Sequence, residues 1–301
     1  MNSLTSQFQD KAFWKNLVPG LGIEDPASFD GMKIWGVPNP DSGDGDAALQ
    51  NLLIREGYVH MPKMQAAVDV ERLAGAVGAL AKVGIPPVFA MVFDQFWIPA
   101  YSLNKVMQVA FGSDYFILPD FWIWHVDPTK SERGWKPHRE KGHKSLFPDG
   151  RPKTLSVWLA LSEATPLNGC MYVVPADRDP TYGTIDDDKW KFEFPEVRAL
   201  PAAAGDVFMW TQALLHWGAH ASPRGETPRI SMAYEFQHSG IEPFNEPLLK
   251  PLSILRFQDR LKLIGKQVLQ YKHMYTLSPD LEAVARELVG NTTVAQAGYG
   301  G

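Results

Sequence analysis

A series of short strand-like segments between residues 115 and 238 is the feature that most constrains how this chain can fold. Clusters of Pro, Gly, Asp and Asn separate these segments and favour turns. The clearest predicted strands lie at 121–126, 154–161, 171–174, 206–210 and 229–236. Short strands at this density are typical of a β-sandwich, a jelly roll or a barrel.

Helical patterns lie on both sides of this strand-rich region. Apolar spacing predicts helices at 47–56, 68–83, 95–111, 252–275 and 279–289, and a short strand at 58–61. Residues 1–46 are predicted to be irregular, and the Gly-rich C-terminal residues are predicted to be frayed. Because no repeat or linker divides the chain, we predict one domain over 1–301. It comprises a mainly helical part at 1–114, a jelly-roll core at 115–238 and a helical part at 239–301.

Composition narrows the possible partners and the cellular setting. The formal charge of −5 does not suggest a nucleic-acid-binding protein, for which a basic surface is typical. Cys170 is the only cysteine, which excludes an intrachain disulfide and a Cys-based zinc site. No apolar run approaches the roughly 18 residues of a membrane span, and residues 1–14 lack a signal-peptide pattern. We therefore expect a cytoplasmic protein with a small-molecule partner, no nucleic acid and no membrane; the oligomeric state cannot be read from the sequence.

Two of the eight histidines begin a His-x-acid pair, namely His125 with Asp127 and His138 with Glu140. Residues i and i+2 of a strand point to the same face, so either pair could bind one metal ion. A second His from a distant strand would complete a 2-His-1-carboxylate set, which suits non-haem Fe(II) that reacts with oxygen. Composition alone predicts roughly one such pair by chance, so further evidence is needed.

The predicted strand 229–236 adds a possible anion site. Its alternation places Arg229, Ser231, Ala233 and Glu235 on one face. A guanidinium beside a hydroxyl can hold a carboxylate, with two bonds from Arg229 and one from Ser231. Without that context, Arg229 could equally be a surface charge at the start of a strand.

From about residue 52 to residue 238 the chain resembles the phytanoyl-CoA dioxygenase family of Fe(II)/2-oxoglutarate oxygenases. The resemblance rests on the order and separation of several motifs, each weak by itself. They are Glu56-Gly-Tyr-Val-His60, His138-Arg-Glu140, the strand 154–161 with Trp158, Asn168-Gly-Cys-Met-Tyr-Val-Val-Pro175, Leu214-Leu-His216, and Arg229 at 13 residues beyond His216.

The resemblance implies a mixed fold with a β-core, a double-stranded β-helix of the jelly-roll type also found in cupins, flanked by helices at both ends. It also implies that His138, Glu140 and His216 are the catalytic metal ligands for Fe(II). The cosubstrates would be O2 and 2-oxoglutarate, whose far carboxylate would meet Arg229 and Ser231. Because Thr154, Ser156 and Trp158 share a mixed face of their strand, they are expected near 2-oxoglutarate.

Spacing decides between the alternative ligands. Asn168 follows His138 by 30 residues, as in the family, but follows His125 by 43. The pair His138/Glu140 is therefore favoured, while His125/Asp127 stays an alternative. His216 is favoured over His220 because it lies ten residues after Asp206.

Three departures from the family pattern concern the site and its rim. Glu140 stands where the family usually has Asp, Arg139 where it has Gln, and residues 176–178 read Ala-Asp-Arg instead of Gly-Ser-His. The acidic segment 176–198 is a predicted lid or binding loop. Known substrates of the family are therefore not transferred to this chain.

The expected function is Fe(II)/2-oxoglutarate-dependent oxidation, by hydroxylation, of a small and largely apolar organic metabolite such as a natural-product intermediate. Two alternatives remain open. A cupin-type metalloenzyme independent of 2-oxoglutarate would not need Arg229. A non-catalytic binding protein on the same fold would not depend on iron.

Overall fold

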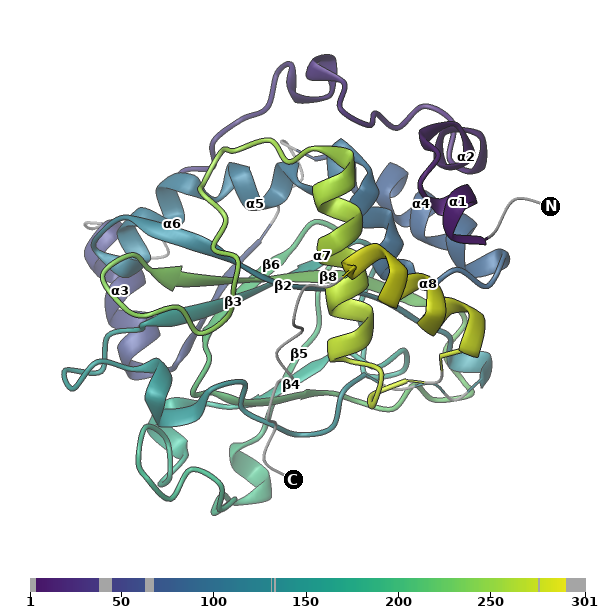
Figure 1. The fold of residues 1–301 in the computed structure, drawn as a ribbon. Helices are drawn as coiled ribbons and strands as arrows, with labels where there is room; N and C mark the ends of the chain where they lie inside the picture. Colours follow the sequence, from purple (N-terminus) through teal and green to yellow (C-terminus); the bar gives the residue numbers. More distant parts are fainter. Residues whose placement is uncertain are drawn as a thin grey trace.

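The computed structural model describes residues 4–37, 45–62, 68–130, 132, 134–275 and 277–290, and two antiparallel sheets form its centre (Figure 1). The larger sheet has five strands, in the order β1 (Tyr58–Met61), β6 (Val207–Thr211), β3 (Thr154–Ala160), β8 (Arg229–His238) and β2 (Tyr115–Val126). The smaller sheet has three strands, in the order β5 (Arg198–Leu200), β4 (Met171–Val174) and β7 (Leu215–Gly218).

Helices from both ends of the chain surround this β-core. They are α1 (Leu4–Phe8), α2 (Lys11–Leu17), α3 (Gly45–Arg55), α4 (Val70–Lys82), α5 (Ile98–Ser102), α6 (Asn104–Phe111), α7 (Phe257–Gln270) and α8 (Pro279–Val289). The predicted mixed fold, with a β-core of the double-stranded β-helix type and flanking helices, is confirmed. No helix in the described ranges is long and apolar enough to cross a membrane.

Several sequence predictions of individual elements were wrong. Part of the supposedly irregular 1–46 forms α1 and α2, whereas 38–44 and the Gly-rich tail lie outside the described residues. The predicted helix 95–111 is two helices, because the chain turns at Leu103 between them. The helix predicted at 252–275 covers only 257–270, and Leu252 has a left-handed φ of 60°. Strands β5 and β7, of three and four residues, were not among the predicted strands.

Strand β2 begins six residues earlier than predicted. Its pairing with β8 shifts register between Ile117 and Phe121, and Pro119 lies within the shift. Such an irregularity interrupts the alternation of side chains on which a strand prediction depends. It also places Asp120 at the point where the two strands change register.

The two faces of the larger sheet pack against different neighbours. On β8, Met232, Tyr234 and Phe236 belong to a hydrophobic cluster that includes residues of α4, α7 and the 87–92 turn. On the opposite face of the sheet, Trp158 and Phe208 pack with residues of the smaller sheet. The alternation predicted for 229–236 is therefore present, and its polar face points between the two sheets.

A buried ion pair connects three distant segments. Arg260 of α7 lies 2.6 Å from the Asp94 carboxylate and donates to the carbonyl of Val92. Asp94 also accepts hydrogen bonds from the backbone N–H groups of Glu24 and Asp25. Both charged side chains are almost completely buried, so each depends on the other for its stabilisation.

Candidate active site

Three side chains with metal-ligating atoms meet between the sheets. The ligating atoms of His138, Glu140 and His216 all lie within 4.8 Å of one another. Backbone hydrogen bonds in both directions, 3.0 and 3.1 Å long, pair His138 with His216 on β7. This bridge joins the loop that carries His138 and Glu140 to the smaller sheet, so the cluster forms as the strand pairs.

The hydrogen bonds of the three side chains leave their remaining atoms oriented toward one another. Nδ1 of His138 donates to the Lys136 carbonyl at 2.6 Å, and Nδ1 of His216 donates to the Leu214 carbonyl at 3.0 Å. These bonds assign Nε2 of each ring as the ligating atom.

Glu140 is held on one side only. Its Oε1 accepts from Ser156 Oγ at 2.9 Å and from Trp210 Nε1 at 3.3 Å, whereas its buried Oε2 has no hydrogen-bond partner among the described residues. Two imidazole nitrogens and a buried carboxylate oxygen are a donor set that fits Fe(II). The residues present therefore fit the metal that the sequence resemblance implies.

Electrostatics within the cluster favour a bound cation. Burial, together with the nearby His216, lowers the pKa of His138 to about 4. Burial opposes the ionisation of Glu140, but the charge of His216 and its hydrogen bond lower the pKa of Glu140 to about 2. Burial also opposes protonation of His216, yet Glu140 raises the pKa of His216. A proton on His216 thus balances the Glu140 carboxylate, and a divalent cation can take its place.

Arg229 is a second buried charge near this cluster. Its side chain is fully enclosed, with 1% of the residue exposed, and its Nη1 donates to Ser231 Oγ at 2.6 Å. Its Nε has no hydrogen-bond partner, and no carboxylate of the described residues forms an ion pair with it. Burial lowers the pKa of Arg229 to about 10. A buried guanidinium without an anionic partner is a site for a carboxylate ligand.

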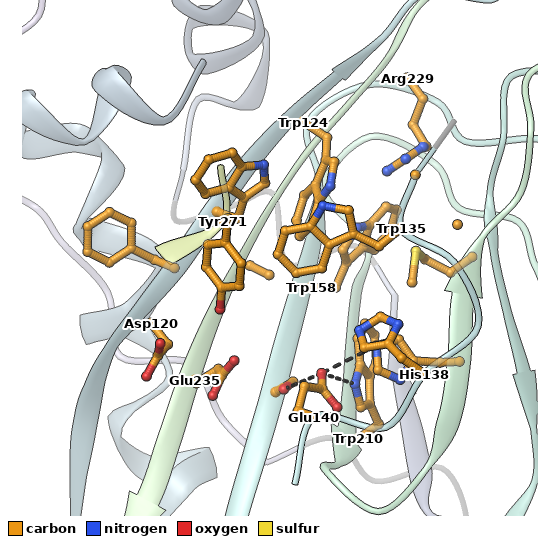
Figure 2. Close-up of a pocket in the computed structure, with 18 residues that line it drawn as sticks. Asp120, Trp124, Trp135, His138, Glu140, Trp158, Trp210, Arg229, Glu235 and Tyr271 are labelled. Atoms are coloured by element: carbon orange, nitrogen blue, oxygen red, sulfur yellow. Dashed lines mark hydrogen bonds and ion pairs between the residues drawn. The ribbon is translucent and has the colours of Figure 1, made fainter. Parts of the chain in front are cut away.

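The cluster and Arg229 line one pocket (Figure 2). Trp158 lies between them in the view of Figure 2, and its ring centre is 6.0 Å from the Arg229 guanidinium. Ser231 does not line the pocket, but it accepts a hydrogen bond from Arg229, which does. Thr154 is buried on the same face of β3, but the lining of the pocket extends only to Ser156 and Trp158. The structure therefore does not bring Thr154 to the pocket.

A comparison of the sequence with family models finds one match. The model of the phytanoyl-CoA dioxygenase (PhyH) family matches residues 88–225, which include His138, Glu140 and His216. This match supports a phytanoyl-CoA dioxygenase-like family for the chain. The match also supports an oxygenase-family enzyme with a dioxygenase-type function. A search of curated proteins finds no match.

Solved structures with a similar fold include three proteins of low sequence identity. The non-heme monooxygenase ThoJ, in its apo form, has a TM-score of 0.50 and 16% identity and covers 81% of this chain and 100% of its own. SnoN, an alpha ketoglutarate-dependent epimerase from nogalamycin biosynthesis, has a TM-score of 0.48 and 18% identity, and the match covers 70% of this chain and 95% of SnoN. EctD from S. alaskensis with bound Fe has a TM-score of 0.48 and 20% identity, and the match covers 74% of this chain and 84% of EctD. At this identity the likeness concerns the fold alone.

The alternative ligands lie elsewhere in the fold. The carboxylate of Asp127 accepts from the backbone and hydroxyl of Thr129 and lies 3.6 Å from Lys130 Nζ. In the part of the chain that the structure describes, neither His125 nor His220 belongs to a group of three potential ligands. The geometry thus favours His138, Glu140 and His216, and their binding of a metal stays a prediction.

Arg139, a departure from the family pattern, has a role that sequence reasoning missed. Its guanidinium donates to Asp179 at 2.6 Å, to Thr181 at 3.2 Å and to the carbonyls of Ala213 and Asp187. It therefore ties the segment 176–198 to the loop between two predicted metal ligands. The replacement of Gln by Arg, together with the acidic residues after 176, was the available signal in the sequence. The same segment exposes Phe194, with 88% of its surface accessible, so only one part of it is anchored.

Replacing Asp179 by Asn is expected to loosen this anchor. The change removes the negative charge but keeps an oxygen that can accept from Arg139, whose bonds to two carbonyls remain. Since a hydrogen bond to a charged group contributes about 1.5–3 kcal/mol, amide exchange in the segment around 179–189 should become about 10- to 100-fold faster. The control is Asp186→Asn, whose exposed ion pair with Lys189 contributes little. Equal exchange in both variants would show that the anchor is unimportant.

Proposed function

We propose that the chain is a cytoplasmic Fe(II)- and 2-oxoglutarate-dependent dioxygenase that hydroxylates a small organic metabolite. The observation that carries the proposal is the joint presence, in one buried pocket, of a 2-His-1-carboxylate cluster and a buried guanidinium without an anionic partner. Either feature alone occurs in other proteins. Together they match the two requirements of this chemistry, a metal with open positions and a carboxylate anchor.

The metal would be held by Nε2 of His138, Nε2 of His216 and a carboxylate oxygen of Glu140. Ser156 and Trp210 hold Oε1 of Glu140, which lies 3.3 Å from Nε2 of His216, and Oε2 stays without a hydrogen-bond partner among the described residues. Three protein ligands leave positions open for a cosubstrate and for oxygen. When bound, Fe(II) supplies the activation of O2.

The cosubstrate would be anchored by Arg229. Its planar guanidinium can give two parallel hydrogen bonds to the far carboxylate of 2-oxoglutarate. Ser231 accepts one bond from Arg229, which fixes the guanidinium, and its own hydroxyl proton remains available for the same carboxylate. Trp158 packs beside this pair and excludes water, which strengthens the ionic contact.

An anaerobic titration with Fe(II), with and without 2-oxoglutarate, tests the proposal. The ternary complex should show the weak visible metal-to-ligand charge-transfer band expected of this family. Arg229→Ala should weaken 2-oxoglutarate binding about 10- to 100-fold, as expected for the loss of charged hydrogen bonds, while Fe(II) still binds. The matched control Arg224→Ala removes an exposed arginine shortly before β8 and should leave the band unchanged.

The same titration separates the two alternative functions. Iron binding without a band, and no effect of Arg229→Ala, would favour a cupin-type metalloenzyme independent of 2-oxoglutarate. Absence of iron binding would favour a non-catalytic binding protein. Either result would refute the proposal.

A further inference from the structure

Two carboxyl groups line the pocket but have no part in the proposed binding of iron or 2-oxoglutarate. Asp120 of β2 is 2% exposed, and Glu235 of β8 is 8% exposed. The two strands are neighbours in the larger sheet, and Asp120 lies where their register shifts. In the view of Figure 2 these carboxyl groups and Arg229 lie at opposite ends of the residues drawn. The pocket therefore has an acidic end as well as a basic end.

The acidic end retains an acceptor that the protein does not use. Oε2 of Glu235 accepts from Lys141 Nζ at 2.8 Å, but Oε1 has no hydrogen-bond partner among the described residues. Asp120 accepts from Asn245 Nδ2 at 2.8 Å and from Gln270 Nε2 at 2.7 Å. Lys141 is not among the residues that line the pocket, so a ligand meets the carboxyl groups rather than the ammonium that balances Glu235.

The wall between the two ends is aromatic. The ring centres of Trp135 and Tyr271 are 4.7 Å apart, those of Trp124 and Trp135 are 5.1 Å apart, and those of Trp122 and Tyr271 are 5.3 Å apart. The faces of aromatic rings attract cations, and tryptophan does so most strongly. Among the described residues that line the pocket there is no lysine, and the one arginine is at the far end.

We infer that the substrate is a small organic amine, bound in its protonated form. Its ammonium group donates to Oε1 of Glu235 and faces Asp120, while its apolar body packs against Trp122, Trp135 and Tyr271. A carboxylate or phosphate at this end would meet two buried acids and is disfavoured. The inference rests on the proposed function for the reaction, although not for the binding itself.

The charge state of Glu235 is consistent with a cationic ligand. Burial raises the pKa of Glu235 to about 7, although Lys141 acts in the opposite direction. An ammonium group beside the carboxyl would favour the ionised form, as any nearby positive charge does. Ligand binding and ionisation of Glu235 would then support each other.

The test is calorimetric binding of benzylammonium and benzyl alcohol, two probes of nearly equal size, to the full-length chain kept metal-free with a chelator. We expect the amine to bind at least about 10-fold more tightly, because a charge-assisted hydrogen bond contributes about that factor. The double variant Lys141→Gln/Glu235→Gln removes both charges together, which avoids leaving one buried charge unpaired. It should bind both probes about equally.

Further variants show which acid is responsible. Glu140→Gln should keep the preference for the amine, since Glu140 belongs to the metal cluster, and so should the exposed control Glu242→Gln. Asp120→Asn provides a second measurement should the double variant not fold, and it should reduce the preference severalfold. Equal binding of both probes to the unaltered chain, or a preference that survives both the double variant and Asp120→Asn, would overturn the inference.

Failure of this inference is distinguishable from failure of the proposed function. The probes are measured without metal, whereas the proposed function is tested by the charge-transfer band. A band without amine preference removes only the substrate class. An amine preference without a band leaves the amine site standing on a protein of another function.

Discussion

The variant Glu140→Ala is expected to lose Fe(II) binding and all measurable consumption of 2-oxoglutarate. The change removes the only carboxylate among the three converging side chains, and with it the anion that balances the charge in a buried site. Residues that merely orient a metal ligand already contribute about 10- to 100-fold to metal affinity, so a ligand itself should contribute more. Anaerobic Fe(II) titration and succinate formation measure the two losses.

The specificity of this effect can be checked with matched variants. His216→Ala should have the same outcome, because it removes a second ligand from the same cluster. Glu163→Ala, at an exposed glutamate after β3, should bind iron as the unaltered chain does. If Glu140→Ala consumes 2-oxoglutarate at the normal rate, then the assignment of the ligands is wrong, and His125/Asp127 becomes the pair to examine.

A second large effect is expected far from the pocket. Asp94→Ala should lower the free energy of unfolding by about 3–5 kcal/mol, since it leaves the buried Arg260 without its anionic partner. It also removes the acceptor for the backbone N–H groups of Glu24 and Asp25. Urea denaturation followed by tryptophan fluorescence measures the change.

The control for Asp94 lies one residue from its partner. Asp259 forms an ion pair with Arg256 on the surface of α7, and Asp259→Ala should cost no more than about 1 kcal/mol. A similar loss in both variants would mean that burial does not strengthen the dependence of Arg260 on Asp94. A loss confined to Asp94→Ala would support the role of the buried pair in joining the N-terminal and C-terminal segments.

Features that depend on neighbouring residues could be predicted from the sequence. The alternation along β8 placed Arg229, Ser231 and Glu235 on one face, as the structure has them, because side-chain direction in a strand follows from local backbone geometry. The strand β4 was predicted with its observed bounds for the same reason. Thr154 shows the limit of this reasoning, since sharing a face with Trp158 does not bring a residue to the pocket.

Family resemblance extended prediction to residues far apart in the chain. It favoured His138 and His216 over His125 and His220 on separation alone, and the structure brings the favoured pair together by backbone pairing. The double-stranded β-helix was likewise predicted through the resemblance, since short strands by themselves left a sandwich, a jelly roll and a barrel open.

By itself the sequence determined the alternation along strands such as β3 and β8, the residues that share a face there, and a set of histidines and acids suited to a metal. Only the tertiary structure decided which charged side chains come close to one another. Arg139 reaches Asp179, Arg260 reaches Asp94, and Asp120 comes beside Glu235 at a register shift. These contacts join residues on different elements, and no local pattern encodes them because they depend on how sheets and helices pack. The acidic end of the pocket, and with it the inferred substrate, became visible only in three dimensions.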